Sequence, residues 1–422
     1  MTLVEMMVAT TMSLIIMGII AQLFGMLGKG ISGSRSTLTL SEQLRAVGNT
    51  LRADLAGLTV PTLPPATPDS DAGYLEIIEG PTTDDPGAST RLTTLRGDFD
   101  DALLLTTRSL GNPFVGRFET GSIESQYAEV AWFCCPAPVQ PVVGTTLYTL
   151  FRRQLLVMGY VGAGQFATGS NSIGGTLPAA YLEYDLSMRS NGAGRLFPNS
   201  LGDLTKRENR FLHNIGGAVS NTLYPYDAIT TALPTSGVLV GSRMGEDVIL
   251  SNVLAFDVRV FDPDAPIHNS TAVAVTPGDP GYAAGGPTAA RGAYVDLGLN
   301  GGSPVALNAT FPPAGSTALL SAGVRVTGTS GTAANKVLDR TYDTGSLHYE
   351  FNGIDENGDG TIDEGTNGQD DNGDGVIDDA NERETSPPYP VPLRGLEVRI
   401  RCYEPQSRQV RQITIRHTFV PH

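Results

Sequence analysis

Cysteine is scarce in this chain, which limits the covalent ways in which the fold can be held together. Only three cysteines, Cys134, Cys135 and Cys402, occur in 422 residues. They are too few for a disulfide framework and too poorly spaced for a zinc site, and adjacent cysteines rarely bond to each other. The sequence leaves open one long-range bridge from Cys402. A chain of this length can bury a core of its own without such bonds.

Basic residues are outnumbered by acidic ones. The chain has 28 Lys and Arg residues against 44 Asp and Glu residues, which gives a formal net charge of −16. A nucleic-acid partner requires a basic face that contacts phosphates, and no Lys or Arg cluster of that kind stands out. The sequence therefore predicts no nucleic-acid partner.

Motifs of catalysis are also missing. The histidines show no metal-binding spacing: His213, His268, His348, His417 and His422. The stretch Gly162-Ala163-Gly164 lacks the third glycine of a dinucleotide-binding loop, and neither a Walker loop nor a nucleophile elbow is present. We therefore expect a protein that is not an enzyme.

The most prominent feature that is present is the apolar run at the N-terminus. Residues Met6 to Gly28 carry no formal charge over 23 positions. As a helix they would extend about 34 Å, which matches a bilayer core of about 30 Å. Glu5 lies at the start of this run, and a carboxylate inside an apolar segment costs roughly 2.5–3.5 kcal/mol unless it has a partner. Glu5 therefore predicts a function that supplies a counter-charge, and the nearest cation is a free N-terminal amine.

The helical pattern continues beyond the apolar run. Apolar residues recur at three- and four-residue steps: Leu38, Leu40, Leu44, Val47, Leu51, Leu55 and Leu58. Charged residues lie between them, so an amphipathic helix is expected as far as Gly57. Residues 1–57 thus predict one long helix, apolar first and amphipathic afterwards. Gly18, Gly25 and Gly28 predict a loosened stretch within it, since glycine lowers helix propensity.

The first five residues, Met1-Thr2-Leu3-Val4-Glu5, resemble in register the mature N-terminus of type IV pilins and type II secretion pseudopilins, with their class III-type N-terminal methylation helix. The resemblance covers about 55 residues. Two positions depart from the family pattern, because Met1 stands where the family usually has Phe and Gln22 stands where many pilins have Pro. No leader ending in Gly precedes Met1, and we expect the numbering to begin at the processed residue.

The resemblance implies a mechanism of assembly. The methylated amine of an incoming subunit, here Met1, would meet Glu5 of a neighbouring copy, while the apolar helices bundle into a filament core. The implied partners are further copies of the chain, the membrane before assembly, a prepilin peptidase and the pilus assembly machinery. The implied location is the inner membrane first and an extracellular filament on the cell surface afterwards.

Residues 58–422 are expected to form a β-rich globular head with long loops, so the predicted fold class is α+β. The chain has 50 Gly and 28 Pro residues, which favour turns. Strands are predicted at Tyr74–Ile78, Ala102–Thr107, Ala128–Phe133, Thr146–Gln154, Asp247–Phe261 and Arg291–Leu299. Strict alternation predicts a C-terminal β-hairpin over 392–421. Loops are predicted at 156–180, 190–200 and 264–345. Within the last, Asn269 and Asn308 match the common acceptor tripeptide for glycosylation.

A second specific motif lies in the segment 350–384, where the same nine-residue frame occurs twice at a spacing of 15. Side-chain oxygens are predicted to bind one calcium ion at Asp355, Asn357, Asp359 and Asp363, and a second at Asp370, Asn372, Asp374 and Asp378. The backbone carbonyls of Thr361 and Val376 are the further ligands expected for this loop chemistry. The position-12 Glu of a full EF-hand is missing, so the loops resemble EF-hand-like or thrombospondin type 3 loops. The segment carries a net charge of −12.

Three functions remain open from the sequence. The first is a structural subunit of a type IV pilus-like filament with a calcium-stabilised head. The second is a minor or tip pilin, or a pseudopilin of a type II secretion machine. The third is a surface adhesin on a simple membrane anchor. Copy number in an assembled fibre separates the first function from the second.

Overall fold

The computed structural model describes most of the N-terminal helix and the sheet of the head. The described residues are 2–62, 71–79, 97–119, 121–141, 146–158, 173–174, 176–190, 195–205, 209–211, 238–270, 273–276, 282, 287–297, 299–300, 303–304, 341–344 and 393–419. Met1, Asn308 and the whole calcium-loop segment 350–384 lie outside them.

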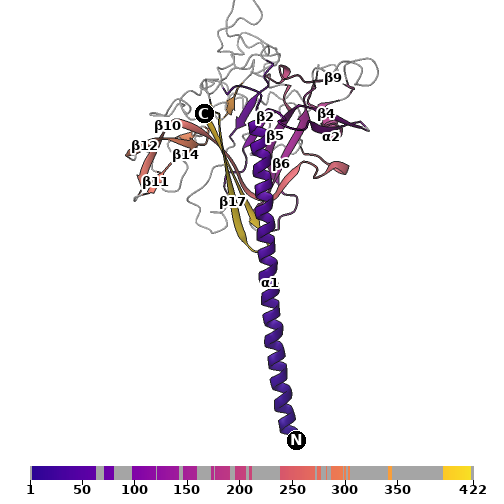
Figure 1. Ribbon diagram of the computed structural model, residues 1–422, viewed down its shortest axis with the longest axis vertical. Helices are drawn as coiled ribbons and strands as arrows, with labels where there is room; N and C mark the ends of the chain where they lie inside the picture. Colours follow the sequence, from indigo (N-terminus) through magenta and orange to yellow (C-terminus); the bar gives the residue numbers. More distant parts are fainter. Residues whose placement is uncertain are drawn as a thin grey trace, which may run out of the picture.

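Helix α1, Leu3–Ala56, is 54 residues long and stands out from the head over its N-terminal half (Figure 1). Thr2 caps its start. Gly57 ends it, and this end is the one that the sequence predicts. A Cβ atom at Gly57 would lie only 2.2 Å from the carbonyl oxygen of Arg108. A glycine is therefore needed where the end of the helix passes the sheet.

The prediction of a loosened stretch between Gly18 and Gly28 is wrong for the single chain, because α1 is unbroken through that region. Each glycine costs a helix about 1 kcal/mol relative to alanine. The glycines do not follow one another directly, and strong helix formers such as Leu and Met lie between them. Backbone hydrogen bonds therefore hold the helix together in spite of the glycines.

The head is built on one large antiparallel sheet. Its strands and helices are β1 (Leu75–Ile78), β2 (Ala102–Arg108), β3 (Phe114–Phe118), β4 (Gly121–Ser125), β5 (Tyr127–Pro136), β6 (Tyr148–Leu156), β7 (Ile173–Gly174), α2 (Leu177–Glu183), β8 (Met188–Ser190), β9 (Arg195–Pro198), η3 (Asp203–Thr205), η7 (Gly241–Arg243), β10 (Val248–Ser270), β11 (Val273–Val275), β12 (Thr288–Val295), β13 (Leu299–Asn300), β14 (Ser303–Pro304), β15 (Thr341–Asp343), β16 (Gly395–Glu404) and β17 (Gln409–Thr418). Within the described residues, the large sheet has ten strands. Its order is β15-β1-β2-β5-β6-β10-β16-β17, and β11 and β12 pair with β10.

The C-terminal half of α1 packs against one face of this sheet. Its buried stripe consists of Leu40, Leu44, Val47, Leu51 and Leu55. These residues recur at three- and four-residue steps, which places them on one side of a helix. They share one core with apolar side chains of β2, β5, β6, β10 and β16. The amphipathic pattern in the sequence therefore marks the part of the helix that belongs to the head.

The α+β fold class and the C-terminal hairpin are confirmed. β16 and β17 pair from Gly395 with Thr418 to Glu404 with Gln409. The strand predicted over Asp247–Phe261 runs on as β10 to Ser270, with a register shift between Asp262 and Pro266. Proline, which lacks an N–H donor, is tolerated in a sheet at such an irregularity.

The loops predicted over 156–180, 190–200 and 264–345 are partly wrong. They contain α2 and the strands β7, β9, β11, β13, β14 and β15, in addition to the end of β10. The strand β12, Thr288–Val295, overlaps the strand predicted at Arg291–Leu299. Several of these strands have only two or three residues, which is too short for an alternating pattern to show in the sequence.

Candidate functional site

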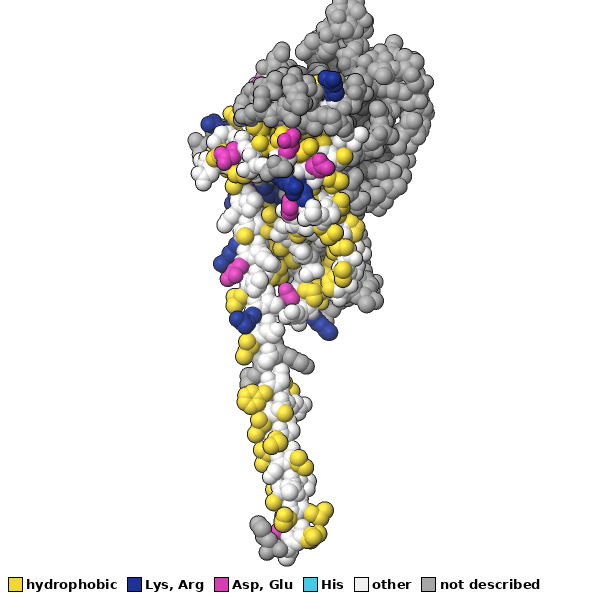
Figure 2. All heavy atoms as spheres, turned by 90° about the vertical axis from the view of Figure 1, so that its right-hand side faces the viewer, with side chains coloured by type: hydrophobic (Ala, Val, Ile, Leu, Met, Phe, Trp, Pro, Cys, Tyr) yellow, Lys and Arg dark blue, Asp and Glu magenta, His cyan; other side chains and the backbone are white. Residues whose placement is uncertain are grey.

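The N-terminal half of α1, Leu3–Met26, is called the stalk here. Its apolar side chains are exposed on all sides: Leu14 is 69% exposed and Phe24 is 70% exposed. In Figure 2 they form the yellow column below the head. Within the described residues, α1 is the one helix that is long and apolar enough to cross a membrane. The stalk therefore needs an apolar environment from outside the chain, and by length and composition it fits a membrane anchor or a signal sequence.

Glu5 takes part in a capping box at the start of α1. Its Oε2 atom accepts a hydrogen bond from the backbone N–H of Thr2 at 2.8 Å. The hydroxyl of Thr2 accepts from the backbone N–H of Glu5 at 3.4 Å. This pairing satisfies two N–H groups at the exposed start of the helix. A carboxylate has about four acceptor sites, so Glu5 keeps capacity for a cation from outside the chain.

Asp54 fixes the other end of α1 to the sheet. It is 3% exposed, and its carboxylate accepts two hydrogen bonds from Arg152 on β6, at 2.7 and 2.8 Å. It also accepts one from the indole Nε1 of Trp132 on β5, at 2.9 Å. The backbone carbonyl of Asp54 accepts from the hydroxyl of Thr107 on β2 at 2.8 Å. One helix residue is thus bonded to three neighbouring strands.

A buried arginine joins the far edge of the sheet. Arg210 donates from Nη1 to Glu76 on β1 at 2.9 Å and to Asp343 on β15 at 2.8 Å, and all three side chains are fully buried. Its guanidinium lies 4.0 Å from the ring centroid of Tyr74. Although burial alone lowers it, the pKa of Arg210 is raised by the two carboxylates. The edge strand β15 and its neighbour β1 are therefore held together by a paired charge as well as by backbone hydrogen bonds.

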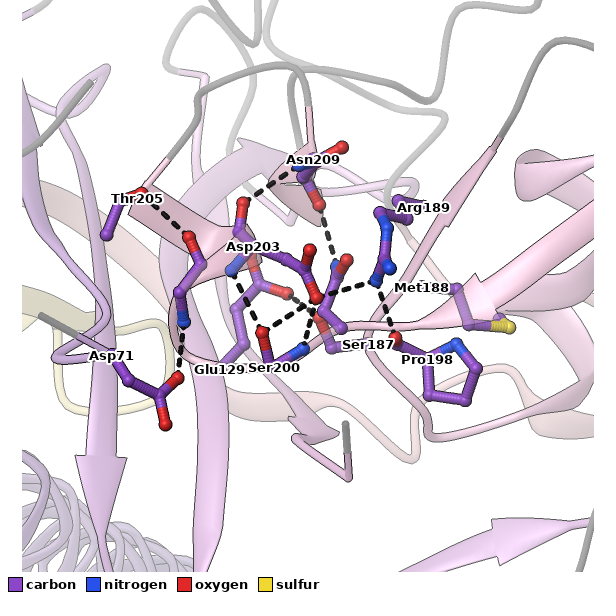
Figure 3. Close-up of polar contacts among 12 residues, drawn as sticks. Asp71, Glu129, Ser187, Met188, Arg189, Pro198, Ser200, Asp203, Thr205 and Asn209 are labelled. Atoms are coloured by element: carbon purple, nitrogen blue, oxygen red, sulfur yellow. Dashed lines mark hydrogen bonds and ion pairs between the residues drawn. The ribbon is translucent and has the colours of Figure 1, made fainter. Parts of the chain in front are cut away.

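Figure 3 shows a neighbouring polar network on the segment that precedes Arg210. Asp203 accepts hydrogen bonds from Ser200 and from Arg189, both at 2.7 Å. Close by, Ser187 donates to the buried carboxylate of Glu129 on β5 at 2.6 Å. Burial raises the pKa of Glu129. These contacts fasten the segment to the sheet, so we assign them a structural role.

A buried carboxylate cluster lies where segment 97–101 runs beside β10. Glu79, Asp98 and Asp101 each offer a carboxylate oxygen, and these oxygens all lie within 4.8 Å of one another. The backbone carbonyl of Asp98 accepts from the N–H of Phe256, and the carboxylate of Asp101 accepts from the N–H of Val258, both at 2.7 Å. Carboxylate oxygens suit hard cations such as Ca²⁺. This cluster could hold a metal ion, although no ion or related protein identifies which one.

Burial and the neighbouring carboxylates raise the pKa of Asp98 well above its usual value. A carboxyl group whose pKa is raised by folding favours the folded state in acid, and that stability is lost as the pH rises through the folded pKa. With chelator present, Asp98→Asn is therefore expected to raise the midpoint of thermal unfolding at pH 8 by roughly 3–6 °C. The variant should also lose less of this midpoint than wild type between pH 5 and pH 8. The measurement is thermal unfolding at both pH values, with the exposed Glu124→Gln as control. If wild type and Asp98→Asn lose thermal stability equally between pH 5 and pH 8, ionisation of Asp98 does not destabilise the fold.

Few of the site residues predicted from the sequence are described. Glu5 is placed at the exposed start of α1. Asn269 is exposed on β10, where it pairs with Ala274 of β11. The calcium-loop residues, Met1 and Asn308 lie outside the described residues.

The disulfide left open for Cys402 does not form. Cys402 is buried as a thiol, and its Sγ donates to the backbone carbonyl of Ser251 at 3.1 Å. Burial raises its pKa to about 12, so the thiol stays protonated. A buried, protonated thiol acts as a small core side chain rather than a reactive one.

Comparison with known proteins leaves the family open. No protein family, no curated protein and no solved structure matches the chain. The long apolar N-terminal helix fits a pilin-like helix, and this is as far as the structure carries the resemblance.

Proposed function

We propose that this protein is a structural subunit of an extracellular type IV pilus-like filament and polymerises through α1. The observation that carries the proposal is the division of one unbroken helix into two parts. The C-terminal part is buried in the head and bonded to it by Asp54, whereas the stalk leaves the head with its apolar side chains exposed. Exposed apolar surface of this extent indicates a partner or a membrane.

The stalk suits both environments that assembly requires. Its 24 residues extend about 36 Å, enough to cross the hydrocarbon core of an inner membrane before assembly. In a bundle of copies, neighbouring stalks supply equivalent apolar contact. The head does not cover the stalk, so copies can approach it from every side. Prepilin peptidase would process Met1, and the assembly machinery would add subunits; the role is not catalytic.

The proposal is tested by electron microscopy of the sheared surface fraction of cells that express the chain. Filaments labelled along their whole length by an antibody against the head are expected. Label confined to filament ends would assign the chain to the minor or tip pilins instead. Label on the cell surface without filaments would favour an anchored adhesin and contradict the proposal.

We further propose that segment 350–384 binds two calcium ions, since two loops with the same ligand frame and a net charge of −12 call for cations. The ligands are those named above, from Asp355 to Asp363 and from Asp370 to Asp378. Loops in extracellular proteins bind calcium at about 10⁻⁴–10⁻³ M, so these sites would fill outside the cell. Their filling would link the stability of the head to export.

Removal of calcium is expected to expose this segment to proteases. An ion that binds only the folded form stabilises it by mass action, so chelation should increase cutting between Phe351 and Arg383. The measurement is limited proteolysis with and without chelator, beside an Asp359→Ala and Asp374→Ala double variant. If wild type and the variant are cut alike and calcium protects neither, the loops are acidic only and the metal sites are withdrawn.

A further inference from the structure

The lower end of the head, next to the stalk, is formed by the turn between β16 and β17. This turn, residues 405–408, lies against the outer part of α1. The hydroxyl of Ser32 donates to Gln406 at 3.3 Å, and the hydroxyl of Thr37 donates to Ser407 at 3.4 Å. The turn thus has a fixed height along the helix.

That height corresponds to the headgroup layer of a membrane in which the stalk is inserted. The uncharged run ends at Gly28. At 1.5 Å per residue, Ser32 lies about 6 Å and Thr37 about 14 Å beyond it. A bilayer adds about 5–8 Å of polar headgroup region on each side of its hydrocarbon core. The turn therefore begins within the headgroup region and extends just past it.

Exposed arginines lie in this turn and on the two elements beside it. Arg35 on α1, Arg408 in the turn and Arg411 on β17 are all exposed. Glu404, the nearest acid of the hairpin, is half-buried and accepts the backbone N–H of Gln406 at 3.1 Å. Figure 2 shows dark blue Lys and Arg side chains at the lower end of the head and along the adjoining helix, above the yellow stalk. Among the described residues here, three exposed arginines stand against the half-buried Glu404 and the exposed Glu42 of α1, although the whole chain carries −16.

We propose that this basic end, formed by Arg35, Arg408 and Arg411, rests on the phosphate headgroups of anionic phospholipids while the chain is anchored in the membrane. The inference rests on the membrane stage of the proposed function. Helix α1 joins the stalk to the basic end. Insertion of the stalk into the membrane therefore brings the basic end to the membrane surface. Anionic lipids attract arginine side chains within about 10 Å of the surface. The contact would hold the head at a set height until the subunit leaves the membrane.

The test places the full-length chain in lipid nanodiscs that contain a nickel-chelating lipid, with a spin label on Gln406→Cys. The three native cysteines are buried, so labelling is directed to the new thiol. A label on Leu110→Cys is the distance control. Leu110 is 77% exposed and follows Arg108, whose N–H donates to the carbonyl of Gly57. Gly57 lies about 36 Å farther along the helix than Gly33, which lies beside Ser407 of the turn. In discs with phosphatidylglycerol, relaxation by nickel should be several-fold stronger at residue 406 than at residue 110.

The arginines are tested by Arg408→Gln combined with Arg411→Gln. Each arginine near an anionic leaflet contributes enough binding that loss of both should shift the equilibrium about thirtyfold toward a lifted head. Relaxation at residue 406 should then fall to its value in discs of phosphatidylcholine alone. The matched control, Arg117→Gln with Arg195→Gln, removes two exposed arginines on β3 and β9 and should change nothing.

Equal relaxation at residues 406 and 110 would overturn the inference, and so would a Gln variant that relaxes like wild type. A Gln variant that loses filaments with unchanged relaxation would assign the basic end to a protein partner, such as an acidic segment of another copy. Failure of the proposed function can be told apart from failure of this inference. A chain whose head contacts the lipid in nanodiscs but which never forms filaments would refute only the filament function. A chain that does not co-purify with nanodiscs would refute the membrane stage itself.

Discussion

Glu5→Ala is expected to leave the protein in the membrane but to abolish or strongly reduce its filaments. Glu5 is the one acidic residue of the stalk, and its carboxylate is exposed at the start of α1. If a neighbour's N-terminal amine pairs with it inside an apolar bundle, its loss leaves that amine unpaired in surroundings of low polarity. Leaving a buried charge without its partner costs about 3–5 kcal/mol at each such contact. Filament yield in the sheared fraction, set against protein in the membrane fraction, measures the effect.

Thr2→Ala separates assembly from capping. Loss of an N-cap hydroxyl costs a helix about 1 kcal/mol, and Glu5→Ala removes the same capping box. If capping were the whole role of Glu5, the two variants would reduce filaments to the same degree. We expect Thr2→Ala to keep most filaments, and Glu42→Ala, an exposed carboxylate on the same helix, to keep all of them. Normal filaments from Glu5→Ala would contradict the assembly role.

Asp54→Ala is expected to destabilise the attachment of α1 to the head by about 3 kcal/mol, because it leaves the guanidinium of Arg152 without its carboxylate in a site where that side chain is 12% exposed. For a head of this size, such a loss lowers the thermal midpoint by roughly 6–12 °C. Fluorescence of Trp132, the single tryptophan of the chain, reports unfolding directly at this contact.

The double variant Asp54→Ala with Arg152→Met isolates the ion pair. Removing both charges from the site should recover part of the lost stability, since no buried charge is then left over. Glu42→Ala serves as the surface control and should change the midpoint by less than about 2 °C. If Asp54→Ala unfolds like that control, Asp54 does not fasten the helix to the head.

The helix and the sheet could be predicted from the sequence because their signals are local. Leu40, Leu44, Val47 and Leu51 repeat at the helical period, and their burial follows from that repeat. The hairpin over β16 and β17 was evident from its alternation. The loosened stretch predicted between Gly18 and Gly28 does not occur in α1, since propensity is a weak signal within a long helix.

The anchors of the head could not be predicted because their partners are distant in the chain. Asp54 lies among apolar positions of α1 and reads as part of its polar face, but its partner Arg152 is 98 residues away. Likewise, Glu76 and Asp343 meet Arg210 only through the order of the strands. A cluster of acids just before an apolar run, Asp98 to Asp101, was a visible signal for the carboxylate cluster. Its position beside β10 depends on the fold.

The measurement that tests the central claim most directly is a helical reconstruction of filaments sheared from cells that express this chain. Our account predicts repeated copies of this chain, with residues Leu3–Met26 of each α1 buried by the same residues of other copies. It also predicts Glu5 within hydrogen-bonding distance of a neighbour's N-terminal nitrogen, and the β-rich head on the outside. A filament in which another protein forms the helical core, or in which the stalks remain exposed, would contradict the account.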